Sequence, residues 1–131
     1  MRRGWLEPSI VAGVALAVRL AYVLQIRGTP LTDVLLIDSA TYQRFARLIL
    51  ASRFHGEEVY SMNPLYPYFV AGIQRLAGDG VVPVLLVQAA LGALAAALIF
   101  ELGRRLFDCS TAWIAGLVAA LYAPYVFYAG A

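Results

Sequence analysis

The sequence has little charge and almost no cysteine. Only 14% of its 131 residues are charged, whereas a typical soluble domain has about 25%. All ten basic residues are arginine, and the net charge is only +2. A nucleic-acid-binding domain needs a clustered basic face, which this composition does not provide. The single cysteine, Cys109, excludes an internal disulfide and a zinc site built from several cysteines.

The motifs of several enzyme classes are also absent. The chain has no G-x-S-x-G, no G-x-x-x-x-G-K-[ST] and no H-E-x-x-H, so nothing supports the corresponding hydrolases, nucleotide motors or metalloproteases. His55, Glu57 and Glu58 have a spacing that metal ligands can take, but a solvated turn explains them better, and Asp33 is an ordinary loop acid. We predict no metal-ligating residues and no certain cofactor; a divalent metal is possible, but nothing in the sequence supports one.

Apolar residues are what the sequence has in excess. They make up 62% of the chain and gather in three blocks, residues 9–26, 81–101 and 112–131. A helix needs about 20 consecutive apolar residues to cross a bilayer. No cleavage site follows the first block, so we interpret it as an uncleaved span rather than a signal peptide. The predicted fold class is an all-α integral membrane protein with three transmembrane helices.

A long loop, residues 27–80, joins the first two blocks. Its segment DSATYQRFARLILA repeats apolar residues at helical spacing from Asp38 onward, with Gln43 and the arginines elsewhere round the turn. A second helical segment follows Asn63-Pro64, which is typical of an N-cap and a first-turn proline, and ends at Gly78. We expect two amphipathic helices that lie at the membrane interface.

Arginine placement predicts the orientation in the membrane. Arginines at 2–3 precede the first block, and arginines at 104–105 lie between the second and third. Both groups lie on one side after two crossings, and the positive-inside rule places that side in the cytoplasm. We therefore expect a cytoplasmic N-terminus, loop 27–80 on the outer side of the cytoplasmic (plasma) membrane, and a surface ion pair between Glu101 and the nearby arginines.

Asp38 is the candidate catalytic residue. Its carboxylate can cap the free N–H groups of the first helical turn, and this alone explains an aspartate here. Alternatively, a carboxylate at the outer surface can accept a proton from an incoming hydroxyl or amine. The two roles can coexist.

Arg19 and two tyrosines are the candidate substrate contacts. A charge inside the first span costs about 2.5–3.5 kcal/mol on insertion scales, so Arg19 should face protein or a water-filled cavity. It either binds an anionic headgroup or phosphate, forms a structural ion pair with another helix, or snorkels. Tyr42 and Tyr66 are explained by packing at the interface, but such a ring can also stack on a sugar or a prenyl chain.

Five segments occur in a family-specific order. They are RLAYVLQ at 19–25, DSATY at 38–42, NPLYPYFVAG at 63–72, LGRRLFD at 102–108 and ALYAPYVFYAG at 120–130. This ordered set resembles the N-terminal part of the membrane-embedded GT-C glycosyltransferases. The resemblance is nearest to glycosyltransferase family thirty-nine, the protein mannosyltransferase and aminoarabinose transferase branch.

The resemblance implies an activity. Family members transfer a sugar from a polyprenyl-phosphate donor to a protein, lipid or glycan acceptor at the outer face. Their first loop carries an essential aspartate, which acts as general base or orients the acceptor, and Asp38 occupies that position. Many members have Glu where this chain has Ser39, and the metal-binding acid of the aminoarabinose branch is missing from residues 61–64. Members have many more spans than three, so we expect a part of a larger bundle that is inactive alone.

Two other classes of protein stay open. A small non-enzymatic adaptor or assembly subunit would use the amphipathic loop to bind lipid or a partner. A reading frame that continues into further spans would favour the enzyme over the adaptor. A transporter fragment predicts polar or broken helices at mid-membrane, for which Pro124 and Arg19 are hints, but the loop with two surface helices fits it poorly.

Overall fold

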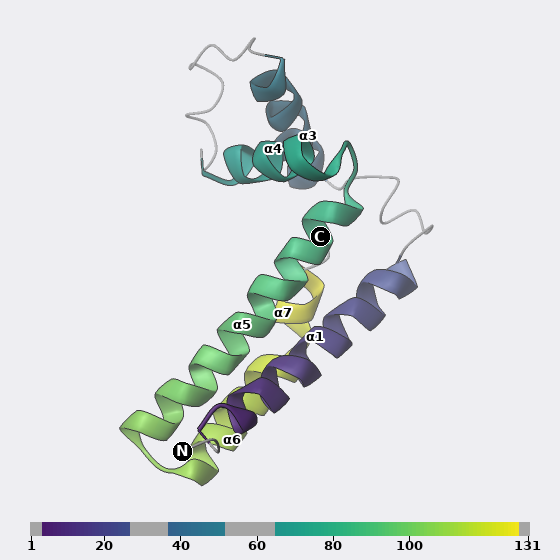
Figure 1. Ribbon diagram of the computed structural model, residues 1–131. Coiled ribbons are helices and arrows are strands. Elements are labelled where there is room, and N and C mark those ends of the chain that lie inside the picture. The colour runs from purple at the N-terminus through teal and green to yellow at the C-terminus, as the bar shows by residue number, and fades with distance from the viewer. Residues whose placement is uncertain (1–3, 27–36, 52–64, 129–131) are drawn as a thin grey trace. The chain divides into compact units, whose positions relative to one another are not determined.

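The computed structural model describes residues 4–26, 37–51 and 65–128. Every regular element in these ranges is a helix: α1 Leu6–Ile26, α3 Ile37–Leu50, α4 Leu65–Ala77, α5 Val82–Leu106, α6 Cys109–Leu121 and α7 Ala123–Tyr128 (Figure 1). The chain divides into two compact units. One contains Met1–Ile26 and Leu85–Gly130, and the other contains Arg27–Val84. We call them the bundle unit and the loop unit.

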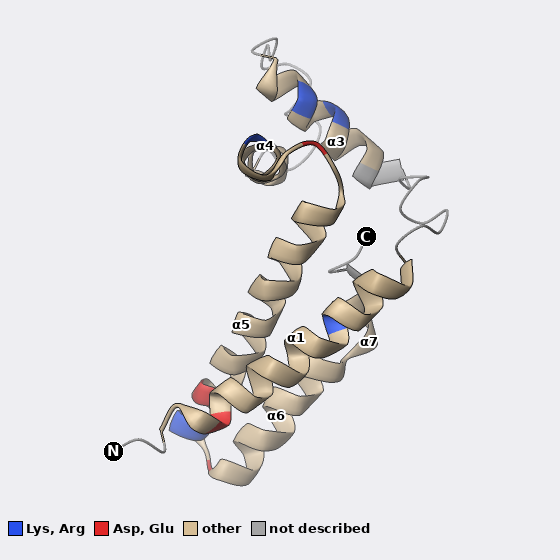
Figure 2. Cartoon of the chain, turned by 45° about the vertical axis from the view of Figure 1, so that its right-hand side comes forward, with Lys and Arg blue, Asp and Glu red and all other residues tan. Residues whose placement is uncertain are grey.

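In the described ranges, two helices are long and apolar enough to cross a membrane. They are α1, with 21 residues, and α5, with 25. At 1.5 Å per residue, 21 residues reach about 30 Å, which matches the hydrocarbon core. Figure 2 shows that the charged residues of α1 and α5 gather mainly at one end of these helices, whereas most of their length is uncharged. The predicted fold class, an all-α membrane protein, is confirmed.

The third apolar block consists of two helices rather than one. Its first helix, α6, begins after Asp108, whose side chain accepts a hydrogen bond from the backbone N–H of Thr111. At Tyr122 the backbone becomes extended, with ψ of 111°, and α7 follows with six residues. Because α6 has only 13 residues, a crossing by this block needs both helices together. The third span therefore stays a prediction.

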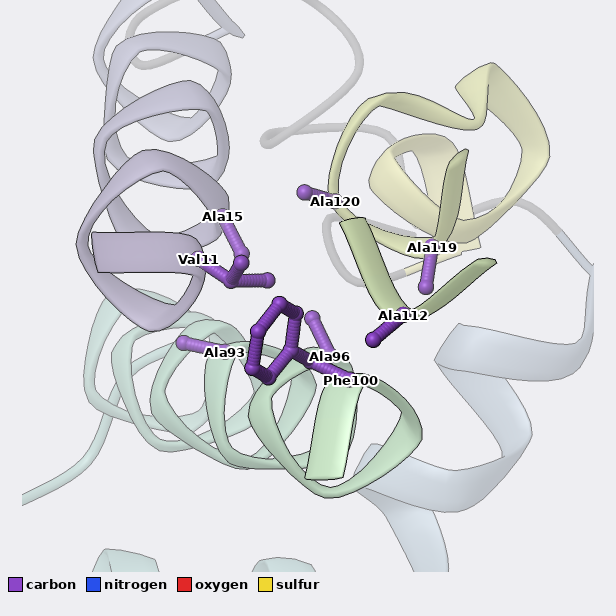
Figure 3. Packing of buried hydrophobic residues seen from close by; sticks show 8 residues of the cluster. All are labelled: Val11, Ala15, Ala93, Ala96, Phe100, Ala112, Ala119 and Ala120. Carbon is purple, nitrogen blue, oxygen red and sulfur yellow. The ribbon is translucent and has the colours of Figure 1, made fainter. Parts of the chain in front are cut away.

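Small side chains form the core of the bundle unit. The buried cluster comprises Val11 and Ala15 of α1, Ala93, Ala96 and Phe100 of α5, and Ala112, Ala119 and Ala120 of α6 (Figure 3). Small residues let helix backbones approach closely, which is how helices associate in lipid. The ring of Phe100 is fully buried and packs edge-to-face on Trp113, with 5.2 Å between ring centroids.

The loop unit is built on α3 and α4, which occur where the helical spacing predicts them. Their core contains Ala46 of α3 together with Val70 and Ala71 of α4. Gly78 ends α4 in a left-handed conformation, with φ of 88°, which glycine adopts without steric cost. Asn63 and Pro64, the predicted cap of α4, lie outside the described residues. The location of both helices at the membrane interface remains a prediction.

Candidate functional site

Asp38 lies at the N-terminal end of the loop unit's first helix. Because α3 begins at Ile37, Asp38 belongs to its first turn, where a negative charge is favoured by the helix dipole. The structure describes this residue's backbone but not its side chain. Both the capping role and the catalytic role of Asp38 stay predictions.

The two predicted substrate-contact tyrosines meet between α3 and α4. The rings of Tyr42 and Tyr66 lie edge-to-face, with 4.7 Å between centroids. Phe69 stacks on Tyr66 from one turn further along α4, at 6.0 Å. Tyr42 follows Asp38 by four residues, so the backbone of α3 places both residues on the same face of the helix. The structure thus brings Tyr42 and Tyr66 together, one helical turn from Asp38.

A buried amide pair joins the same two helices and was not predicted. Nε2 of Gln74 donates to Oε1 of Gln43 at 2.6 Å, and the two side chains are 4% and 8% exposed. The placement of Gln43 with the exposed arginines of α3 was therefore wrong. Its spacing from Ala46, three residues on, was the signal that both share the buried face. Oε1 of Gln74 has no hydrogen-bond partner among the described residues.

Arg19 is buried in the bundle unit. Figure 2 shows a single basic band along α1, and Arg19 is the one Lys or Arg between Leu6 and Ile26. The residue is 3% exposed, so of the two predicted surroundings, protein or a water-filled cavity, Arg19 faces protein. Its described hydrogen bonds go to the backbone carbonyls of Ala15, Ala119 and Ala120 rather than to a carboxylate. A contact with an anionic headgroup remains a prediction.

The predicted ion pair at the end of α5 is confirmed. Glu101 accepts from Arg104 at 2.6 Å and from Arg105 at 2.7 Å, and Arg104 also lies 3.8 Å from Glu7 of α1. These four side chains balance to zero net charge. They lie at or near one end of a groove of about 530 Å³ between α1 and α5, which also has Trp5 in its wall.

No metal site can be built from the part of the chain that the structure describes, because it holds no group of three His, Cys, Asp or Glu side chains. His55, Glu57 and Glu58 lie outside that part, as does Asp33. Of the residues considered at the outset, the structure therefore brings together the aromatic side chains of α3 and α4, and it separately buries Arg19.

Every regular element of the described ranges is a helix. The helices α1 and α5 are apolar, and those of the loop unit are amphipathic. Together they define an all-α membrane protein. Residues 61–131 match the sequence model of the dolichyl-phosphate-mannose-protein mannosyltransferase family. The match covers more than half of the chain, which therefore belongs to this family of membrane glycosyltransferases, as the resemblance indicates. It includes α4 to α7, whereas Arg19 and Asp38 precede it. No curated protein and no solved structure is a significant match.

Proposed function

We propose that the full-length protein transfers a sugar from a polyprenyl-phosphate donor to an acceptor at the outer face of the membrane. The family match over residues 61–131 is the observation that carries this proposal. A polyprenyl-phosphate sugar has an apolar tail that stays in the bilayer and a polar head that reaches its surface. Two apolar helices of spanning length and two amphipathic helices between them suit a donor of this kind.

In the proposed reaction, the acceptor's nucleophilic oxygen or nitrogen attacks the anomeric carbon of the sugar. A new bond forms there while the bond from that carbon to the phosphate oxygen breaks, and polyprenyl phosphate leaves with the electron pair. The nucleophile must lose its proton, and Asp38 is the proposed base that accepts it. A carboxylate at the head of α3 is suited to this role because an interfacial helix keeps it near both the lipid and water.

Tyr42 and Tyr66 are the proposed substrate contacts. Their edge-to-face contact fixes two rings on adjacent helices, and a fixed aromatic ring can stack on a sugar or a prenyl chain with little loss of side-chain entropy. Tyr42 lies one turn from Asp38 on α3, so a substrate held by these rings would be close to the proposed base.

Asp38→Asn in the full-length protein tests the proposed base. The amide keeps the size of the side chain but cannot take up the proton, so sugar transfer should fall by about 100-fold or more. Transfer is measured in membranes with a polyprenyl-phosphate sugar donor, and expression and membrane insertion should stay normal. Asp33→Asn, in the same loop, is the matched control and should keep full activity. Undiminished turnover by Asp38→Asn would refute the role of Asp38.

A further inference from the structure

The break between α6 and α7 leaves backbone carbonyls without their usual donors. In a continuous helix the carbonyl of Ala120 would accept from the N–H of residue 124, but Pro124 has no N–H. The extended backbone at Tyr122 also ends α6. The N–H of Tyr122 still donates to the carbonyl of Val118, but no donor within the helix follows for the carbonyls of Ala119 and Ala120. Ala119 and Ala120 are 6% and 0% exposed, and a buried carbonyl without a hydrogen bond is costly in an apolar environment.

Arg19 supplies donors to these carbonyls from another helix. Its Nη1 lies 3.1 Å from the carbonyl oxygen of Ala120, and its Nη2 lies 3.3 Å from that of Ala119. Nη1 also lies 3.0 Å from the carbonyl of Ala15 in α1 itself. The planar fork of a guanidinium can serve two adjacent acceptors at once, which a lysine ammonium does less well. The two terminal nitrogens are thus both engaged by the fold.

Gly92 of α5 makes room for this guanidinium. A Cβ at position 92 would lie 2.5 Å from Nε and 3.1 Å from Cδ of Arg19, so the arginine side chain would have to move to make room for it. Nε itself is buried and has no hydrogen-bond partner among the residues that the structure describes. The side chain of Arg19 therefore lies against the backbone of α5 on one side and bonds to the end of α6 on the other.

We propose that Arg19 is an interhelical cap, which closes the C-terminal end of α6 and makes the proline break tolerable inside the membrane. Because Gly92 has no side chain, the guanidinium can lie against α5 and still contact the carbonyls of α6. The charge in α1 and the proline in the third apolar block are then energetically coupled. Each destabilises the protein if the other is absent. This role is independent of the proposed glycosyl transfer.

A double-mutant cycle between Arg19→Met and Pro124→Ala tests the proposal in the full-length protein in nanodiscs. Hydrogen exchange of residues 118–128 and the unfolding temperature are the readouts. Arg19→Met should speed exchange and lower the unfolding temperature, because it leaves the two carbonyls unpaired. Pro124→Ala restores a donor to Ala120, so in that background Arg19→Met should cost clearly less. Equal losses in both backgrounds would overturn the proposal.

Gly92→Ala provides a second cycle should Arg19→Met fail to insert. The added methyl group displaces the guanidinium, so exchange at 118–128 should rise, and Pro124→Ala should suppress the rise. Gly13→Ala is the matched control in α1, because a Cβ there meets nothing within 4 Å. A headgroup role for Arg19 predicts instead that the effect of Arg19→Met vanishes in nanodiscs without anionic lipid, and that result would also overturn the proposal.

Discussion

Single glycines decide how closely the helices of the bundle unit pack. A Cβ at Gly116 of α6 would lie 3.0 Å from Cβ of Phe100 and 3.1 Å from Cγ1 of Val11. These neighbours belong to α5 and α1, and both are fully buried. One missing methyl group therefore allows contact among all three helices. Lipid tails are as apolar as the side chains, so such van der Waals contacts contribute much of the association.

We expect Gly116→Ala to destabilise the protein by about 1–3 kcal/mol, the usual cost of overpacking a tight core. The change also improves intrinsic helix propensity. A net loss of stability would therefore show that the steric cost at position 116 exceeds this gain. Its matched control is again Gly13→Ala, which has the same gain in propensity and no neighbour within 4 Å. Denaturant titration in detergent measures both. Equal stability of the two variants would mean that the contact at Gly116 is not close.

The side chains of the candidate site are held differently from those of the bundle. Tyr42 and Tyr66 are fixed by ring contact, and Gln43 and Gln74 by a buried amide hydrogen bond. A hydrogen bond of this kind contributes modestly when made but leaves a costly unpaired group when one partner is removed. The pair is thus one constraint on the register of α3 on α4, the register in which the two tyrosines also meet.

Among the helical elements, α6 shows how a short polar connection can start a helix. The N–H of Thr111 donates to Oδ1 of Asp108 at 2.7 Å. This hydrogen bond from the backbone of Thr111 holds the pKa of Asp108 below its usual value. A carboxylate whose folded pKa is lowered adds stability above its unfolded pKa, and that stability is lost as pH falls through the folded value.

Asp108→Asn should therefore remove part of the pH dependence. Asparagine caps a helix about as well as aspartate but does not titrate, so the variant should lose less stability than the parent when pH falls below about 4. Asp108→Ala should lack the cap at every pH. Unfolding temperature measured from neutral to acidic pH distinguishes the three proteins. Parallel curves for parent and Asp108→Asn would show that Asp108 does not contribute through its charge.

Elements that depend on local signals were predictable from the sequence. The length and apolar content of their segments predicted α1 and α5, and the helical spacing of apolar residues predicted α3 and α4. The break after Leu121 was not predicted, because the third block is apolar on both sides of it. Pro124 marks the position of the break. However, whether a buried helix breaks at a proline depends on hydrogen-bond donors from other parts of the chain. Here the donor is Arg19, which no local pattern connects to α6.

The candidate site was predictable only in part. Tyr42 and Tyr66 were singled out by type, and the structure brings them together. The family resemblance favoured a catalytic role for Asp38 over helix capping alone, but the family match begins only at residue 61. Gln43 was assigned to the wrong face because its polar side chain was given more weight than its spacing from Ala46, and its hydrogen-bond partner Gln74 lies 31 residues away.

For the molecule as a whole, the orientation in the membrane is the property that the proposed outer-face chemistry most needs. The arginines at one end of the bundle predict that the α5–α6 connection is cytoplasmic. Cys109 lies there, is exposed, and is the one cysteine among the 131 residues. It is thus a natural probe of sidedness.

We expect a membrane-impermeant maleimide to label Cys109 in inverted membrane vesicles but not in intact cells. The converse probe is Ala51→Cys in a Cys109→Ser background, which places an exposed thiol after α3. This second thiol should react in intact cells. Labelling of Cys109 from outside would reverse the orientation and place the loop unit in the cytoplasm, where it could not serve the proposed reaction.

The hydrogen bond between Arg19 and Ala120 also bears on how the protein is made. The two residues are 101 positions apart, and ribosomes add about 5–20 residues per second. Roughly 5–20 s of synthesis therefore separate Arg19 from its partner carbonyl. During that interval its guanidinium must be sheltered by the translocation channel or by water. Packing of α1 against α6 is therefore a late step relative to the synthesis of α1, and a chain stalled before residue 119 would leave the guanidinium of Arg19 without these two carbonyls.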